Sequence, residues 1–187
     1  MKTILTDLPG VLIIEPRVFP DARGFFFESY HAQRYALAGI SSQFVQDNHS
    51  CSIKGTIRGL HYQLRHPQGK LVRVIQGTVF DVAVDIRRGS PTFGQWTSVE
   101  LSAGNKRQLY IPGGLAHGFC VTSDVAELEY KCTDFYIADD QHGVLWSDPT
   151  IGIQWPVREA ILSHNDRGYL PLTLDRDDLP TYEQTAT

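Results

Sequence analysis

The sequence predicts an all-β protein, a β-sandwich or jelly-roll barrel with one or a few short helices. About ten short segments rich in branched and aromatic residues follow one another along the chain. Glycine and proline, 16 and 10 residues respectively, fall largely between these segments. The clearest helical pattern is short, at residues 31–38. Short strands separated by turn residues are typical of sandwiches and jelly rolls.

The first part of the chain combines strands with this single helix. Residues 11–19 form the first predicted strand, and a turn at 21–24 leads into an aromatic strand. Within 31–38, Tyr35 supplies packing, and Gly39 follows where a helix C-cap is expected. Extended structure resumes at 44–49.

The middle of the chain is a series of strands. Residues 56–63 and 71–76 are the first two, and Gly77 with Thr78 is predicted to be a hairpin turn into 79–86. The 79–86 strand alternates, with Phe80, Val82, Val84 and Ile86 on one face and Asp81 and Asp85 on the other. Further strands are predicted at 96–101, 108–111, 117–121 and 126–133, before a loop-rich C-terminal part.

Composition restricts the class of protein. The chain of 187 residues shows no repeat or linker, so we expect one domain over 1–187, with a polar, mobile tail from about 175. A net charge of -4 argues against nucleic-acid binding, and no apolar run is long enough for a membrane span. An N-terminus without a signal-like apolar stretch indicates a cytoplasmic protein. The three cysteines have no metal-like spacing and read as reduced thiols.

The main functional candidate is residues 55–63 with 69–73. His61 lies there between two cations, Arg58 and Lys70. His61 could bind a metal, move a proton or fill space, because a histidine in a strand is by itself more often structural. Arg58 and Lys70 alone would be solvated charges at a strand edge.

A metal site is the less favoured reading. Metal-binding cupins, which are jelly rolls, have a glycine, then His-x-His and a glutamate, and later a P-x-G-x-x-H motif. Residues 112–117 match the second motif and end at His117. The first begins at Gly55 and reaches His61, but Gln63 replaces its second histidine and no glutamate follows in place. Two ligands are too few for a catalytic metal site, so no metal is predicted.

RGLHYQ at 58–63 and GKLVR at 69–73 closely resemble the dTDP-4-dehydrorhamnose 3,5-epimerase family. Further segments match the family in the expected order over roughly residues 10–170. These segments are 15–19, 21–28, 44–50, 111–119, 130–134, 151–156 and 162–166.

The resemblance implies a cupin-like jelly roll that works as a homodimer without metal or organic cofactor. It also implies a dTDP-4-keto-6-deoxyhexose substrate. The implied reaction inverts C3 and C5 of dTDP-4-dehydro-6-deoxy-D-glucose and yields dTDP-4-dehydro-L-rhamnose. The product leads to dTDP-L-rhamnose for cell-surface polysaccharide.

Proton removal next to a ketone requires a base at the carbon and donors at the oxygen that becomes an enolate. His61 titrates in the working pH range, and Lys70 offers a point charge for the C4 oxygen. By resemblance, Asp166 orients His61 and Tyr130 is the general acid on the opposite face. Tyr136 shares the strand parity of Tyr130, so spacing alone leaves both tyrosines open.

The substrate also needs donors for its diphosphate, and Arg23 and Arg58 suit this because guanidinium binds phosphate bidentately. By resemblance, further substrate contacts come from Glu28, Gln46, Asn48, His117, Gln141 and Asn165. The resemblance also implies strand exchange, in which Arg23, Phe26 and Glu28 come from the neighbouring subunit. From the residues alone, Phe26 reads as core or interface.

Gln141 and Asn165 depart from the glutamate and lysine of many relatives, which puts those two contacts in doubt. Three other functions stay open. An epimerase acting at only C3 or C5 would use the same residues. A metal-dependent cupin isomerase or dioxygenase would bind stoichiometric metal. A non-catalytic sugar-binding jelly roll would leave the base, acid and enolate donors without a role.

Overall fold

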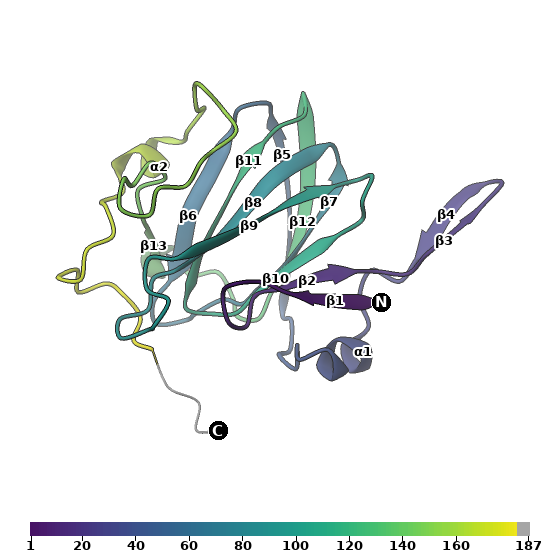
Figure 1. Cartoon of the computed structure of the whole chain (residues 1–187), viewed down its shortest axis with the longest axis horizontal. Coiled ribbons are helices and arrows are strands. Elements are labelled where there is room, and N and C mark those ends of the chain that lie inside the picture. The colour runs from purple at the N-terminus through teal and green to yellow at the C-terminus, as the bar shows by residue number, and fades with distance from the viewer. Residues whose placement is uncertain (183–187) are drawn as a thin grey trace.

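The protein is a β-sandwich of two antiparallel sheets (Figure 1), seen in a computed structural model that describes residues 1–182. In the first sheet the strand order is β1-β2-β10-β7-β12-β5. These strands are β1 (Lys2–Leu5), β2 (Leu12–Glu15), β10 (Gln108–Ile111), β7 (Lys70–Gln76), β12 (Val125–Cys132) and β5 (Gln46–Ile53). The second sheet has the order β13-β6-β11-β8-β9. Its strands are β13 (Gln141–Gly143), β6 (Ile57–Gln63), β11 (Leu115–Val121), β8 (Thr78–Asp85) and β9 (Trp96–Ser102).

Two short α-helices and a hairpin complete the architecture. The helices are α1 (Ala32–Leu37) and α2 (His164–Gly168), with a 3-10 turn at Ala138–Asp140. The hairpin pairs β3 (Val18–Asp21) with β4 (Gly24–Phe27). The predicted all-β jelly-roll sandwich with few short helices is confirmed. None of the helices in the described residues is long and apolar enough to cross a membrane.

The main core lies between the two sheets, where alternate residues of facing strands meet. Val72, Val74 and Leu128 of one sheet belong to the same buried cluster as Ala83 and Leu101 of the other. A second cluster covers the outer face of β8 and β6. The predicted alternation of β8 is confirmed, because Val82 and Val84 join this outer cluster while Asp81 lies on the opposite face.

The predicted hairpin at Gly77 is wrong. β7 pairs with β10 and β12, whereas β8 pairs with β11 and β9, so the chain crosses there from one sheet to the other. Gly77 has φ +76, and a Cβ at this residue would lie 2.1 Å from the Val125 carbonyl oxygen. Glycine is therefore needed for a corner between sheets, which sequence spacing does not distinguish from a hairpin turn.

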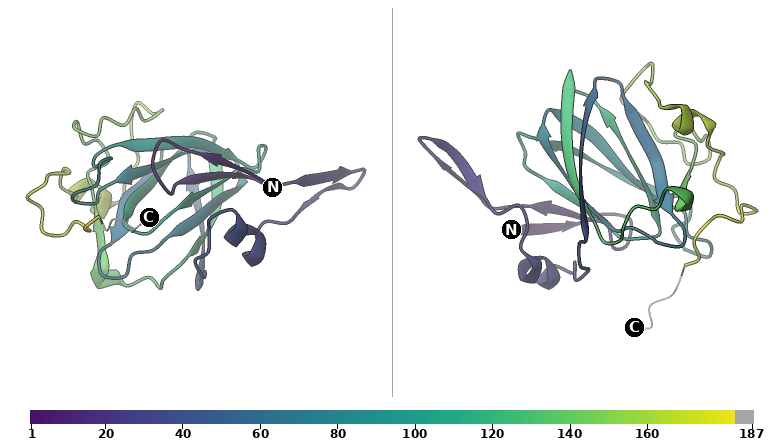
Figure 2. Two further views of the ribbon diagram at one scale, coloured as in Figure 1. Left: turned by 60° about the horizontal axis from the view of Figure 1, so that its bottom comes forward. Right: turned by 180° about the vertical axis from the view of Figure 1, so that it is seen from behind.

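The predicted strand at 11–19 is two strands, β2 and β3, with Pro16 between them. β2 joins the six-stranded sheet, whereas the β3–β4 hairpin projects away from the sandwich (Figures 1 and 2). Phe25 and Phe26 on this hairpin are 56% and 69% exposed. The helix α1 agrees with its predicted place, and Gly39 follows it with φ +93.

The C-terminal part packs along the five-stranded sheet near β6 and β13 (Figure 2). The tail that the sequence predicts to be mobile begins at about 175, and its residues 175–182 lie against the sandwich. Leu179 is buried there in the cluster that covers β6 and β8, and the side chain of Arg176 is only 10% exposed. The Arg176 guanidinium donates hydrogen bonds to five residues, Tyr62, Gly143, Leu170, Pro171 and Asp178, and composition alone does not reveal these contacts. Residues 183–187 of the predicted tail lie outside the described residues.

Candidate functional site

A cavity of about 410 Å³ lies between the two sheets and collects most of the predicted site residues. The five-stranded sheet contributes Arg58 and His61 from β6 and His117 from β11. The six-stranded sheet contributes Lys70 from β7 and Tyr130 from β12. The cavity is also lined by Gln46, Asn48, Ser50, Tyr62, Gln63, Gln68, Phe119, Tyr136 and Gln141.

Arg58 and His61 share one wall because β6 is irregular between them. Residues three apart in a regular strand point to opposite faces. Here the pairing with β11 shifts register between His117 and Phe119, opposite this part of β6. A Cβ on Gly59 would lie 2.5 Å from the His117 carbonyl oxygen, so the two strands approach more closely than a side chain allows. This bulge brings both side chains to the cavity.

His61 is held by a carboxylate. Its Nε2 lies 2.5 Å from Oδ1 of Asp166, which is 3% exposed. Asp166 belongs to α2, and the Ser163 hydroxyl both caps this helix and donates to Asp166 Oδ2. Burial raises the pKa of Asp166, but hydrogen bonds from His61 and Ser163 outweigh it and leave this pKa below its usual value. Asp166 therefore stays ionised and fixes the imidazole.

Tyr169 is a contact of His61 that sequence reasoning missed. Its ring meets the imidazole edge-on, with 5.7 Å between ring centroids. The Gln141 amide donates to the Tyr169 hydroxyl at 3.2 Å. The ring lies over Gly143 so closely that a Cβ there would be 2.3 Å away. Nothing in the local pattern around Tyr169 marks this contact, because it depends on how Tyr169, just after α2, packs against β13.

Lys70 and Tyr130 reach the cavity from the opposite sheet, and in the described residues neither side chain has a protein hydrogen-bond or ion-pair partner. Burial lowers the pKa of Lys70, against smaller opposing effects of Cys132 and Asp81. Burial also raises the pKa of Tyr130. Tyr130 thus keeps its proton at neutral pH, and both groups are available to a bound molecule.

A second histidine–aspartate pair lies beside the first. His117 Nε2 is 2.8 Å from Oδ1 of Asp81, which has no exposed surface. The other carboxylate oxygen, Oδ2, is buried without a hydrogen-bond partner among the described residues. Sequence reasoning placed Asp81 on its face of β8 but gave it no role. A charged residue in the middle of a largely apolar strand was the available signal.

Gln46 and Gln63, two further polar residues of the cavity, form hydrogen bonds within the protein. Gln46 donates to Asn48 and accepts from the backbone N–H of Tyr136. Gln63, at the position of a cupin histidine ligand, instead donates to backbone carbonyls of two loops and accepts from a third backbone group. Tyr136 lies beyond the end of β12, so the shared strand parity with Tyr130 is wrong. No group of three potential metal-ligating side chains occurs within residues 1–182.

Four predicted residues lie apart from this cavity in the single chain. Arg23 pairs with Asp21 at the tip of the projecting hairpin, which also carries Phe26. Glu28 pairs with Arg34 of α1. Asn165 lines an adjacent hollow together with Gln141 and Tyr169.

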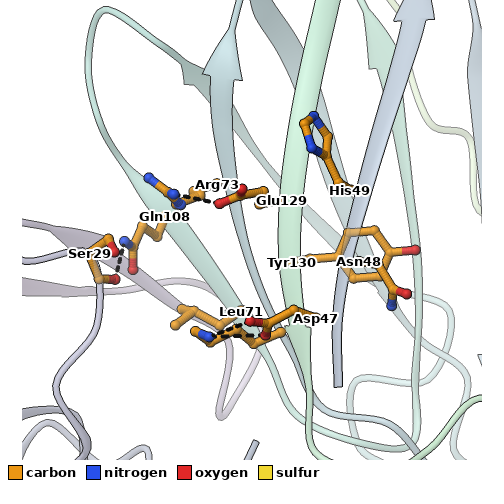
Figure 3. Close-up of a pocket in the computed structure, with 10 residues that line it drawn as sticks. Ser29, Asp47, Asn48, His49, Leu71, Arg73, Gln108, Glu129 and Tyr130 are labelled. Carbon is orange, nitrogen blue, oxygen red and sulfur yellow. Dashed lines mark hydrogen bonds and ion pairs between the residues drawn. The ribbon is translucent and has the colours of Figure 1, made fainter. Parts of the chain in front are cut away.

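A smaller hollow of about 210 Å³ is lined from the other side of the six-stranded sheet (Figure 3). Its charged side chains are already paired, with Arg73 2.5 Å from Glu129 and Lys131 3.0 Å from Asp47. Tyr130 borders it, but the hydroxyl in Figure 3 points away from Arg73 and Ser29. The larger cavity, with its unpaired Lys70 and Tyr130, is therefore the better candidate for chemistry.

Comparisons with known proteins identify the family. The family model described as dTDP-4-dehydrorhamnose 3,5-epimerase matches residues 5–173. A dTDP-4-dehydrorhamnose 3,5-epimerase of Shigella flexneri is 58% identical over 168 residues, covering 89% of this chain and 93% of that protein.

Solved structures give the same result. A dTDP-6-deoxy-D-glucose-3,5-epimerase from Legionella pneumophila, in complex with dTDP-4-keto-L-rhamnose, superposes with TM-score 0.94 at 51% identity, covering 97% of this chain and 98% of that one. A 3'-monoepimerase from Streptomyces bikiniensis, in complex with dTDP-quinovose, reaches TM-score 0.89 at 34% identity, covering 95% and 92%. Family model, sequence identity and structure converge, and the chain belongs to the dTDP-4-dehydrorhamnose 3,5-epimerase family.

Proposed function

We propose that this protein inverts C3 and C5 of dTDP-4-dehydro-6-deoxy-D-glucose to give dTDP-4-dehydro-L-rhamnose, with the cavity between the sheets as its active site. One observation carries the mechanism. His61 on β6 and Tyr130 on β12 border the same cavity from opposite sheets. Inversion requires a base and an acid on opposite faces of the sugar, and this arrangement meets that requirement.

His61 is the proposed base for both carbons. Asp166 accepts the Nε2 proton, which leaves the Nδ1 lone pair for the substrate. The negative Asp166 also stabilises the imidazolium that forms when His61 takes the proton. The imidazole is 29% exposed, so a sugar in the cavity can reach it.

Lys70 is the proposed partner of the C4 oxygen. As a proton leaves C3 or C5, negative charge moves onto this oxygen, and an ammonium beside it lowers the barrier. Lys70 supports this role because it approaches from β7 without an ion-pair partner in the described part of the chain. A lysine already paired with a carboxylate would offer the enolate less.

Tyr130 is the proposed acid that returns a proton to the opposite face. Its phenol is partly buried beside the core between the sheets, where bulk water competes least. Tyr136 also borders the cavity but is 51% exposed and lies outside β12. This difference favours Tyr130 over Tyr136.

The nucleotide end of the substrate is proposed to contact Gln46, Asn48, Arg58 and His117 in one subunit and Arg23, Phe26 and Glu28 in the other. The projecting β3–β4 hairpin supports a homodimer with exchanged strands, because Phe19, Phe25 and Phe26 are exposed in the single chain. Gln141 and Asn165 border one hollow at the cavity and are proposed to contact the substrate without the charges of many relatives.

Deuterium exchange tests the reaction. The purified protein is incubated with the 4-keto sugar nucleotide in D₂O, and deuterium at each ring carbon is measured by NMR. We expect incorporation at both C3 and C5. Incorporation at only one carbon would replace this proposal by a single-position epimerase, an activity that the 3'-monoepimerase neighbour makes a concrete alternative.

Light scattering tests the dimer. The wild-type chain is expected to have twice the mass of the 21.0 kDa monomer. Phe26→Asp should weaken the dimer and raise KM, whereas Leu37→Asp, an exposed residue of α1, is the matched control. A monomeric wild-type chain with full activity would refute the shared site.

A further inference from the structure

The C-terminal segment at residues 174–182, which we name the strap, lies beyond the part of the chain that the family model matches. It is nevertheless packed against the sheet that carries the proposed base (Figure 1). Leu179 is 4% exposed. Backbone hydrogen bonds join Arg88, after β8, to Pro180 and Tyr182. The strap is thus a fixed part of the described structure.

Arg176 is the centre of the strap. Its guanidinium donates to the Leu170 carbonyl at 3.0 Å and to both carboxylate oxygens of Asp178, at 2.8 and 2.7 Å. It also donates to the Tyr62 hydroxyl at 3.1 Å and the Gly143 carbonyl at 2.9 Å. The Arg176 side chain is 10% exposed, and it holds the pKa of Asp178 at about 2. A buried planar guanidinium that satisfies several fixed acceptors at once orients them strongly.

Two of these acceptors are neighbours of the proposed base. Tyr62 follows His61 in β6, and Gly143 is the residue of β13 that pairs with His61. β13 has only three residues and lies at the edge of its sheet, so its own ladder holds it weakly. The rear of β13 is further held by His142, which stacks on Tyr62 and lies 3.3 Å from Asp178.

The front of β13 carries the contacts of the imidazole. The ring of Tyr169 rests on Gly143, where no Cβ would fit, and meets His61 edge-on. Gln141 of the same strand donates to the Tyr169 hydroxyl. A displacement of β13 would therefore move the Tyr169 ring. The His61 imidazole would then lose its contact with Tyr169 and keep only its hydrogen bond to Asp166.

We propose that Arg176 is a positioning residue for epimerisation. It fixes β13 from behind, β13 supports the ring of Tyr169, and this ring positions the imidazole of His61. The inference rests on the proposed role of His61 as the base. Arg176 itself does not line the cavity. Its effect should appear in the chemical step rather than in substrate affinity, because the geometry of proton transfer is more sensitive to small displacements than binding is.

Kinetics of Arg176→Gln give the first test. We expect kcat to fall by about tenfold, with KM within about twofold of wild type and the rate of deuterium exchange reduced by the same factor as kcat. Arg176→Lys should recover little, because an ammonium cannot reach all of these acceptors. Arg158→Gln, at an exposed arginine, controls for charge and should leave kcat unchanged.

Leu179→Ala separates positioning from stability. It removes buried apolar packing of the strap without removing a hydrogen bond to β13. We expect Leu179→Ala to lower thermal stability while the folded protein keeps its kcat. The inference would be overturned if Arg176→Gln kept a wild-type kcat, or if its loss matched that of Leu179→Ala at equal fraction folded.

Histidine NMR provides a readout independent of activity. With ¹³C-labelled histidine, the His61 ring signal is assigned by its disappearance in His61→Asn. Arg176→Gln should move the His61 signal and leave that of His49, on the outer face of β5, in place. An unmoved His61 signal would contradict the inference even if wild type showed no epimerase activity. Inactivity of wild type would by itself contradict only the proposed function.

Discussion

The cavity contains two histidine–aspartate pairs that have the same chemistry and different surroundings. His61 and His117 face each other in the register of β6 and β11. The His61 side chain is 29% exposed, whereas that of His117 is 9% exposed. Access to the cavity therefore distinguishes a histidine that can take a proton from a sugar from one that is mainly part of the wall.

The two carboxylates differ as well. Asp166 comes from the N-terminal turn of α2, far along the chain, and has a second donor in Ser163. Asp81 comes from the strand next to His117, and its Oδ2 has no partner in the described residues. Asp166 keeps a second hydrogen-bond donor when the charge of His61 changes, whereas the buried Asp81 depends on His117 for its stability.

The largest expected difference is in turnover. His61→Asn should lower kcat by about 10³-fold or more, because it removes the proposed base. His117→Asn should mainly raise KM and keep kcat within about tenfold. Steady-state kinetics with the 4-keto sugar nucleotide measure both variants. Equal losses of kcat would remove the distinction between the two pairs.

Tyr130→Phe separates the two halves of the reaction. We expect inversion to fall by about 10²-fold, because the proposed acid on the opposite face is lost. His61 should still remove the substrate proton and return a deuteron to the same face in D₂O. NMR should then find deuterium in recovered substrate without inverted product. If exchange disappeared together with inversion, Tyr130 would be needed for proton removal as well.

Replacing His117 should cost more unfolding free energy than replacing His61, the reverse of the order expected for kcat. His117→Phe leaves the buried Asp81 without its donor and should cost about 3 kcal/mol of unfolding free energy. His61→Phe leaves Asp166 with the Ser163 hydroxyl and should cost about 1 kcal/mol. Urea denaturation at pH 7 measures both. A more costly His61→Phe would show that the exposed pair is the structural one.

The smallest expected effect is on the pH dependence at high pH. Burial lowers the pKa of Lys70, and the negative Asp81 acts against this shift. The alkaline fall of kcat should therefore have an apparent pKa below the ordinary lysine value of about 10.4. Asp81→Asn removes the stabilising charge, lowers the pKa of Lys70 further and should shift this fall to lower pH. Lys131→Gln, on the outer face, is the control, and a shift toward higher pH in Asp81→Asn would contradict the assignment.

Local sequence patterns predicted much of this molecule. The alternation of β8, the helix before Gly39 and the spread of short strands all follow from side-chain spacing and turn residues. The resemblance around RGLHYQ and GKLVR identified the family, and it predicted eight of the fourteen residues that line the cavity. These features are set within a few residues of each other, so the sequence reports them directly.

Tertiary structure decided how those residues meet. Spacing in β6 would have placed Arg58 and His61 on opposite faces, and only the close approach of β6 and β11 at Gly59 brings them to one wall. Tyr169 reaches His61, and Arg176 reaches Gly143, across loops whose course no local period encodes. The sequence by itself determined which chemical groups are present and the face each strand offers. Their mutual geometry was decided by packing between segments distant in the chain, where close fit rather than periodicity selects the contacts.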